Sequence, residues 1–224
     1  MEPVKKFPNV FVVNPYKRSR YYTRSLTKDT FFDEYVLTRP DGFYREVDPN
    51  RSKLFAGIAK GISQIGFRED STVLYLGASH GYTPSFVSDM ISKGVMYALD
   101  FAPRVVRDLV FMAEKRKNIA PMLADAKQPD TYKQFLPKDG VDVVYMDIAQ
   151  RNQVEIFTKN CHAFLKQGGF GLLALKSRSI DVTKKPAVIF KEVRAALEQE
   201  FVVVDYRELY PFEKDHALFV VKKR

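Results

Sequence analysis

The most constraining stretch of the chain is an apolar run that leads through a glycine-containing turn into a helical pattern. Residues 73–76 (Val-Leu-Tyr-Leu) are strand formers, and residues 77–81 (Gly-Ala-Ser-His-Gly) follow directly. From Pro84 on, apolar residues recur at helical spacing. Gly77 allows a sharp exit from the strand, and Gly81 allows a ligand to approach the backbone closely. The pattern predicts a ligand site at the helix start, where backbone N–H groups lack partners.

The next apolar run, residues 95–99, ends in Asp100. An acidic residue at the tip of the second strand can bind both hydroxyls of a ribose, so the pair indicates a nucleoside-cofactor site. A dinucleotide site favours G-x-G-x-x-G, whereas this loop reads G-x-x-x-G with Ser79 and His80 between the glycines. The spacing favours S-adenosylmethionine over a nicotinamide dinucleotide. From the loop alone, plain turn glycines remain the alternative.

Composition narrows the class of protein. The 224 residues suffice for one α/β domain with an appendage or for two small domains. Lys and Arg number 36 against 27 Asp and Glu, which favours a polyanionic partner such as nucleic acid, solvated lysines being the alternative. The single cysteine, Cys161, excludes a disulfide framework and suits a reducing cytoplasm. No run approaches the roughly 18 apolar residues of a membrane span.

Residues 1–50 differ in pattern from residues 51–224, and we predict a domain boundary there. Short strand-like pieces alternate with turn residues, which predicts a small antiparallel β module; the pieces are 10–13, 21–23, 35–37 and 43–46. Basic and aromatic side chains intermingle in it, which fits stacking on RNA or, equally, a strand with one core face and one solvated face. These side chains are Tyr16, Lys17, Arg18, Arg20, Tyr21, Tyr22 and Arg24.

A helix is predicted to begin after this module, with Asn50 or Ser52 as its N-cap. Its apolar residues share one face at helical spacing, namely Leu54, Ile58, Ile62 and Ile65. Lys53 falls in the first turn, where the helix dipole disfavours a cation. This lysine therefore either extends into water or is held in place for use.

From residue 73 onward, predicted strands and helices alternate. The strands are 73–76, 95–99, 120–124, 141–146, 170–175, 202–206 and 217–222, with helices near 84–92, 104–116, 151–165 and 186–199. This alternation predicts a largely parallel sheet covered on both faces. No helical pattern separates the last two strands, so they should form an antiparallel hairpin. The fold class is α/β, a class I (Rossmann-like) methyltransferase sheet preceded by the β module.

Ligands of open α/β sheets bind at the carboxyl ends of the strands. Those ends carry Asp100, then Asp125 with Ala126, then Asp147 with Gln150, then Lys176, as well as the glycine loop. Asp125 is placed to accept a hydrogen bond from an adenine amino group. Their position on one rim indicates a shared site.

The chain resembles the fibrillarin family, in particular its shorter archaeal form. The resemblance covers about three quarters of the chain and lies in ordered segments: 51–54 (RSKL), 73–78 (VLYLGA), 101–104 (FAPR), 113–119 (AEKRKNI), 125–126 (DA), 141–150 (VDVVYMDIAQ), 176–182 (KSRSIDV) and 213–217 (EKDHA). It implies S-adenosylmethionine-dependent methylation of a ribose 2′-hydroxyl in rRNA or tRNA. It also implies a box C/D guide ribonucleoprotein, with guide and target RNA, a Nop-domain scaffold protein and a kink-turn-binding ribosomal-type protein.

The resemblance assigns site residues. Those expected to bind the cofactor are Gly77, Ala78, Gly81, Tyr82, Thr83, Asp100, Phe101, Asp125, Ala126, Asp147 and Gln150. Lys53, Asp147 and Lys176 match the family's Lys-Asp-Lys set, with His216 as a fourth member. We predict that Lys176 takes the hydroxyl proton, that Asp147 orients it and that Lys53 stabilises the developing alkoxide; Asp147 as the base is the alternative. No metal ion is expected.

Three features, at four positions, depart from the family pattern. His80 and Tyr82 occupy the loop where small residues and threonines are usual, and their bulk either narrows the pocket or points outwards. Asp100 replaces a glutamate, and Val47 replaces a tryptophan. Alternative functions are a non-catalytic RNA- or protein-binding module, a protein methyltransferase and, least favoured, a dehydrogenase. Self-association through the β module is left open.

Overall fold

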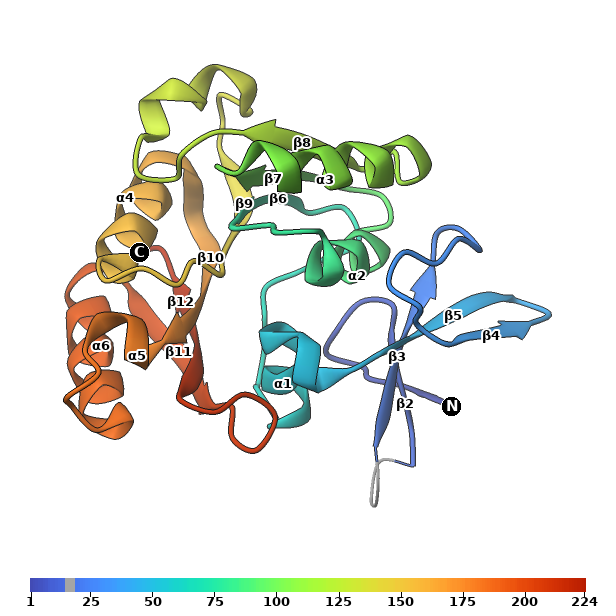
Figure 1. Ribbon diagram of the computed structural model, residues 1–224, viewed down its shortest axis with the longest axis horizontal. Coiled ribbons are helices and arrows are strands. Elements are labelled where there is room, and N and C mark those ends of the chain that lie inside the picture. The colour runs from blue at the N-terminus through green and yellow to red at the C-terminus, as the bar shows by residue number, and fades with distance from the viewer. Residues whose placement is uncertain (15–18) are drawn as a thin grey trace.

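The computed structural model describes residues 1–14 and 19–224, which form two β-sheets (Figure 1). The smaller, N-terminal sheet is antiparallel, with strand order β1-β2-β3-β5-β4. Its strands are β1 (Glu2–Pro3), β2 (Val10–Val13), β3 (Arg20–Ser25), β4 (Val36–Arg39) and β5 (Gly42–Val47). The four predicted strand pieces are therefore correct within a few residues, and only the two-residue β1 was missed.

The basic and aromatic side chains of this sheet are mostly engaged within the protein. Tyr22 is buried, and the guanidinium of Arg20 pairs with the carboxylate of Glu46. Tyr21 packs against the main core. These contacts favour the structural interpretation for the described part of the cluster. Tyr16, Lys17 and Arg18 lie outside the described residues.

The larger sheet has seven strands in the order β11-β12-β10-β9-β6-β7-β8. They are β6 (Thr72–Leu76), β7 (Val95–Asp100), β8 (Ile119–Leu123), β9 (Val141–Met146), β10 (Leu165–Lys176), β11 (Val202–Glu208) and β12 (His216–Lys222). Strands β10, β9, β6, β7 and β8 are parallel, and β12 is antiparallel to both β10 and β11. The predicted parallel sheet and its final hairpin are confirmed.

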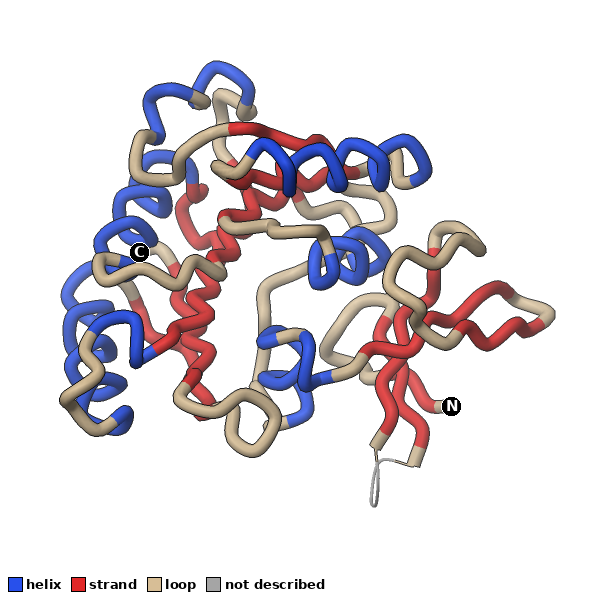
Figure 2. Tube along the Cα trace, in the orientation of Figure 1, coloured by secondary structure: helices blue, strands red, loops and turns tan. Residues whose placement is uncertain are grey.

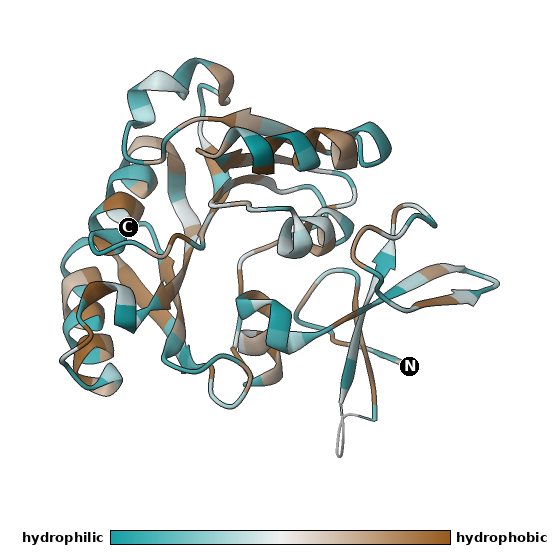
Figure 3. Ribbon diagram, in the orientation of Figure 1, coloured by the Kyte–Doolittle hydropathy of each residue, from teal (hydrophilic) through white to brown (hydrophobic). Residues whose placement is uncertain are grey.

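Helices cover both faces of this sheet (Figure 2). They are α1 (Lys53–Ala59), α2 (Tyr82–Met90), α3 (Pro103–Lys115), α4 (Gln153–Phe164), α5 (Ser177–Ile180) and α6 (Pro186–Glu200). Alternate residues of β6 point to opposite cores: Val73 and Tyr75 join α1, α2 and α3, whereas Leu74 and Leu76 join α4 and α6. A strand that is buried on both faces has a nearly continuous run of apolar residues. The brown, hydrophobic colour along β10 and β12 shows such runs (Figure 3).

Helix α1 is shorter than the sequence pattern predicts. It ends at Ala59, because Gly61 adopts a left-handed φ of +76°. The N–H groups of Gly61 and Ile62 donate to the carbonyl oxygens of Ile58 and Gly57, both at 3.0 Å, which is the Schellman arrangement. Ile62 and Ile65 follow the helix but remain buried in the same core. Their apolar spacing marks burial and not helix length.

Two elements near the end of the sheet also differ from the prediction. Strand β10 begins at Leu165, five residues earlier than expected, with an irregular register between Leu165 and Phe170. Gly168 and Gly169 lie in this irregular part, and their turn-like composition hides the strand. The short helix α5 was not predicted.

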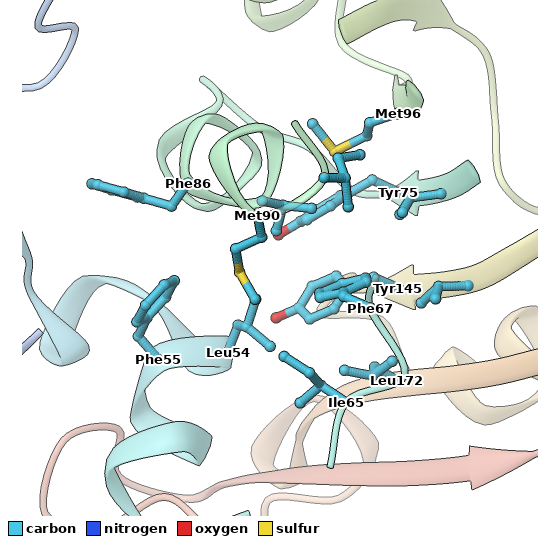
Figure 4. Packing of buried hydrophobic residues seen from close by; sticks show 14 of the residues in the cluster. Leu54, Phe55, Ile65, Phe67, Tyr75, Phe86, Met90, Met96, Tyr145 and Leu172 are labelled. Carbon is cyan, nitrogen blue, oxygen red and sulfur yellow. The ribbon is translucent and has the colours of Figure 1, made fainter. Parts of the chain in front are cut away.

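The N-terminal sheet packs on the same core as α1 and α2, which lie between the two sheets (Figure 1). Phe7, Val10 and Val47 belong to this core, so the position of the usual tryptophan is filled by a buried valine. Figure 4 shows Leu54 of α1 and Met90 of α2 beside the rings of Tyr75 and Tyr145. A domain boundary at residue 50 stays a prediction.

A buried network of charges joins the two sheets. Asp89 of α2 accepts hydrogen bonds from the guanidinium groups of Arg45 (3.1 Å) and Arg116 (2.6 Å), and Arg45 also pairs with Glu34. The side chains of Asp89, Arg45 and Arg116 have no exposed area. Two cations and two anions balance, and Thr23 of β3 adds a hydroxyl donor to Asp89 at 2.7 Å. The network fixes β3 and β5 against α2.

Across the described residues, no helix is both long and apolar enough to span a membrane.

Candidate active site

The glycine loop after β6 is shaped by the close approach of the neighbouring strand end. Gly77 has a φ of +81°, and a Cβ there would lie 2.5 Å from the carbonyl oxygen of Asp147. The N–H groups of Gly77 and Ala78 donate to the carbonyl oxygen of Leu99, and the N–H of Asp147 donates to that of Leu76. The ends of β6, β7 and β9 are thereby joined in one rim.

Asp100 holds this rim through both carboxylate oxygens. One oxygen accepts from the N–H of Ser79 at 2.9 Å, and the other accepts from the N–H of Ala102 at 3.0 Å. Ser79 has a φ of +49°, so the loop conformation depends on such a contact. A carboxylate has about four acceptor positions, so each oxygen can still accept from a ribose hydroxyl.

A cavity of about 300 Å³ opens beside Asp100. The sequence-predicted residues that line it are Gly77, Asp100, Phe101, Asp125, Ala126, Asp147 and Gln150. Apolar side chains complete the wall, and Phe101, 68% exposed, stands at its mouth. Oδ1 of Asp125 accepts from the N–H of Lys127 at 2.9 Å, and its Oδ2 accepts no hydrogen bond from the residues that the structure describes. An apolar slot with two carboxylates fits an adenosine group.

A second cavity of about 450 Å³ adjoins the first, sharing Gly77, Ser79 and Asp147 with it. The predicted residues Lys53, Ala78, Tyr82 and Thr83 line this cavity. Ser52 caps α1, and its hydroxyl accepts from that of Thr83 at 3.0 Å, so the starts of α1 and α2 are fixed together. The two connected cavities provide space for a nucleoside and for a further group that extends from it.

The two bulky loop residues, His80 and Tyr82, line the second cavity and not the first. The ring of His80 is largely exposed, with Nδ1 2.6 Å from Asp108 of α3. The hydroxyl of Tyr82 accepts from the N–H of Asp48 at 3.0 Å, and the guanidinium of Arg51 lies 4.1 Å from its ring centre. Tyr82 thus connects α2 to the N-terminal sheet. Neither side chain is among those lining the adenosine-sized cavity.

Gly81 has a packing role at the start of α2. It has a φ of +91° at the start of α2, and a Cβ there would lie 2.6 Å from Met112 and 2.9 Å from Leu109. These side chains belong to α3. The glycine therefore permits the packing of α2 against α3, and the close approach of a ligand at this position stays a prediction.

Lys53 and Asp147 form an ion pair where the two cavities meet. Nζ of Lys53 donates to Oδ2 of Asp147 at 3.0 Å, and both side chains are about one-fifth exposed. Lys53 is therefore held in place and does not extend into water, which are the two alternatives that its position in the first turn of the helix left open. Lys176 ends β10 and is exposed, and within the described residues its ammonium group makes no hydrogen bond or ion pair. The carboxylate of Asp147 pairs with Lys53, and among the described residues it makes no hydrogen bond or ion pair with Lys176, which the sequence predicts it to orient.

His216 lies opposite Lys176 in the β10–β12 register. Its Nδ1 donates to the carbonyl oxygen of Lys214 at 2.6 Å, which leaves Nε2 as the acceptor of the neutral ring. Burial lowers the pKa of His216 below its ordinary value of 6.5, and the ammonium of Lys53 acts in the same direction. Glu213 and Asp147 oppose this shift. The lowered pKa favours the neutral ring.

This shift predicts a loss of stability in acid. The folded state disfavours protonated His216, so its contribution is fully present above about pH 6.5 and falls as pH decreases towards the lowered folded-state pKa. Urea unfolding at pH 7.5 and 5.5 should show a larger loss for the wild type than for His216→Gln. Equal losses in the two proteins would contradict the assignment.

Two buried amide side chains near the site belong to no motif in the sequence. Gln153 is buried and bonds to both backbone groups of Lys176, and buried Asn160 donates to the carbonyl oxygen of Ala126 at 2.8 Å. Their only sequence signal is a polar residue on the apolar face of a helix. In the described residues, no group of three or more His, Cys, Asp or Glu is arranged to hold a metal ion.

The sheet order, the glycine loop and the acidic strand ends define a class I methyltransferase. A sequence profile of the fibrillarin family matches residues 1–224, and the chain belongs to that family. It is 48% identical over 203 residues to the fibrillarin-like rRNA/tRNA 2′-O-methyltransferase of Methanocaldococcus jannaschii, with 90% of this chain and 87% of that one covered.

Solved structures of fibrillarins from this family have the same fold as this chain. Aeropyrum pernix fibrillarin with natively bound S-adenosyl-L-methionine is 35% identical, with a TM-score of 0.87 over 98% of this chain and 96% of that one. The fibrillarin of a fibrillarin/Nop5p complex is also 35% identical, with a TM-score of 0.87 over 96% of this chain and 98% of that one.

Proposed function

We propose that this chain transfers a methyl group from S-adenosylmethionine to the 2′-hydroxyl of a ribose in rRNA or tRNA. The observation that carries the proposal is the Lys53–Asp147 pair at the junction of the two cavities, with Lys176 and His216 on adjacent strand ends. The membership in the fibrillarin family and the relative named as an rRNA/tRNA 2′-O-methyltransferase support it.

The residues around the cavities fit the cofactor. Asp100 would bind the ribose hydroxyls, Asp125 the adenine amino group, and the cavity lined by Tyr82 and Thr83 the methionine part. The natively bound S-adenosylmethionine of the A. pernix relative supports this assignment. When bound, the cofactor supplies an electrophilic methyl group on a sulfonium.

The reaction needs a base, because a ribose hydroxyl is a poor nucleophile at neutral pH. As the oxygen–carbon bond forms and the carbon–sulfur bond breaks, the hydroxyl proton must leave. We assign its removal to Lys176, with Asp147 as the alternative base. Lys53, fixed by Asp147, would stabilise negative charge on the oxygen, and neutral His216 would accept a hydrogen bond through Nε2.

Its proposed partners follow from the family. The complex of a relative with Nop5p supports binding to a Nop-domain scaffold protein. Box C/D guide RNA, target RNA and a kink-turn-binding protein complete the proposed particle. The guide would select the nucleotide, so this subunit needs only to contact the backbone and the presented sugar. Self-association through the N-terminal sheet stays a prediction.

The cofactor proposal is tested by calorimetric titration with S-adenosylmethionine. Asp100→Asn should weaken binding about tenfold or more, because a charge-assisted hydrogen bond contributes about 1.5–3 kcal/mol. Asp139→Asn is the matched control, since Asp139 is exposed and lines neither cavity. Absence of binding by the folded wild type would contradict the cofactor assignment.

The reaction is tested in a particle reconstituted with a guide and a complementary target RNA. Methyl transfer should occur at the guided nucleotide and should be lost when that nucleotide carries a 2′-deoxyribose. Transfer that persists on the deoxy target would place the methyl group elsewhere and contradict ribose methylation.

A further inference from the structure

Strand β9, which pairs with β10 on one side, ends before it reaches Lys176. The last registered pair between β10 and β9 is Leu173 with Met146, three residues before Lys176. On the opposite side, Lys176 faces His216 of β12. A buried backbone N–H or C=O without a strand neighbour needs another partner.

The side chain of Gln153 supplies that partner. Gln153 is the first residue of α4 and has no exposed area. Its Oε1 accepts from the N–H of Lys176 at 3.0 Å, and its Nε2 donates to the carbonyl oxygen of Lys176 at 3.0 Å. One side-chain amide thus satisfies both backbone groups, as a neighbouring strand would.

The same amide contacts a residue that lines the adenosine-sized cavity. Nε2 of Gln153 also donates to the carbonyl oxygen of Gln150 at 2.9 Å. Gln150 lines the adenosine-sized cavity and follows Asp147 by three residues. Gln153 therefore fixes the end of β10 relative to the loop that carries Asp147.

We infer that Gln153 is a positioning residue for methyl transfer, which holds the main chain from which the Lys176 side chain projects. The inference rests on the proposed function. The side-chain nitrogen of Lys176 has no hydrogen-bond or ion-pair partner in the described residues, so its place in the site depends on its backbone. A displacement of about 1 Å can cost about a hundredfold in rate.

Helix α4 offers a matched control in a second buried amide. Asn160 donates to the carbonyl oxygens of Ala126 (2.8 Å) and Ile156 (2.9 Å), and it accepts from the hydroxyl of Tyr132. It supports the adenine side of the cofactor cavity and makes no contact with Lys176. We therefore expect substitution of Gln153 to change kcat and substitution of Asn160 to change the Kd of the cofactor.

The test compares Gln153→Met with Asn160→Leu in the reconstituted particle. Gln153→Met should lower kcat by about 10- to 100-fold, with a much smaller change in the Kd of S-adenosylmethionine. Asn160→Leu should instead raise that Kd, because its amide holds the carbonyl oxygen of Ala126 in the cavity wall. Gln153→Glu should be intermediate, because it retains the acceptor for the Lys176 N–H but cannot donate to the two carbonyl oxygens.

Amide hydrogen exchange provides a readout that is independent of activity. The N–H of Lys176 should exchange faster in Gln153→Met than in the wild type, and Asn160→Leu should not change it. Wild-type kcat in Gln153→Met, or a loss that only follows the fraction of unfolded protein, would overturn the inference. An inactive wild-type particle would instead overturn the proposed function, and this inference with it.

Discussion

Replacing Asp89 by alanine should lower the free energy of unfolding by about 3–5 kcal/mol. The carboxylate of Asp89 is the common acceptor for Arg45 and Arg116, and none of the three side chains is exposed. Its removal leaves two buried guanidinium groups, and among the described residues Glu34 is then the one remaining counter-charge paired with them. Unfolding in urea, followed by circular dichroism, measures the change.

The matched control is an exposed ion pair of the same kind. Glu198→Ala removes the partner of Arg194 on α6, where both side chains are about half exposed, and should cost about 0.3–0.5 kcal/mol. Comparable losses in the two variants would contradict a special role for the buried network.

The loss of stability in Asp89→Ala should also be concentrated in one part of the protein. Asp89 accepts from the hydroxyl of Thr23 and from the N–H of Leu26, so it joins α2 to β3 and the residue that follows. In Asp89→Ala, amide exchange should increase first in the N-terminal sheet, while the strands of the larger sheet remain protected. Uniform exchange throughout the chain would instead indicate that the network stabilises both sheets equally.

This network was not visible in the sequence, although the fold was. Strand β6, the glycine loop and Asp100 lie within 30 residues and follow local rules of periodicity and turn chemistry, so they were predicted. Asp89 meets Arg45 across 44 residues and Arg116 across 27. Charged residues are usually exposed, and no local pattern distinguishes the few that are buried in pairs.

In the site, too, local sequence patterns predict single residues but not the contacts that the fold creates between distant ones. The ion pair of Lys53 and Asp147 spans 94 residues, and only the family resemblance placed the two together. The family resemblance did not identify Gln153. This side chain takes the place of a strand neighbour at Lys176, and a motif does not show where a neighbouring strand is missing. The missing neighbour results from the different lengths of β9 and β10, and the sequence pattern had already misplaced the start of β10.

Lys176→Arg should lower kcat in the reconstituted particle by about 10²- to 10⁴-fold, if Lys176 removes the proton of the ribose hydroxyl. Arginine retains the positive charge and a similar reach, but its guanidinium does not lose a proton in proteins. The substitution thus separates a base from a residue that only supplies charge. The side chain is exposed, so the variant should fold normally, which thermal unfolding will show.

Lys53→Arg is the matched control for charge, because an arginine there can still pair with the carboxylate of Asp147. If Lys53 only stabilises the developing alkoxide, this variant should retain far more activity than Lys176→Arg. High activity in Lys176→Arg would reject Lys176 as the base. Asp147 would then be the remaining candidate, and Asp147→Asn, which keeps the shape of the side chain but cannot accept a proton, should abolish transfer.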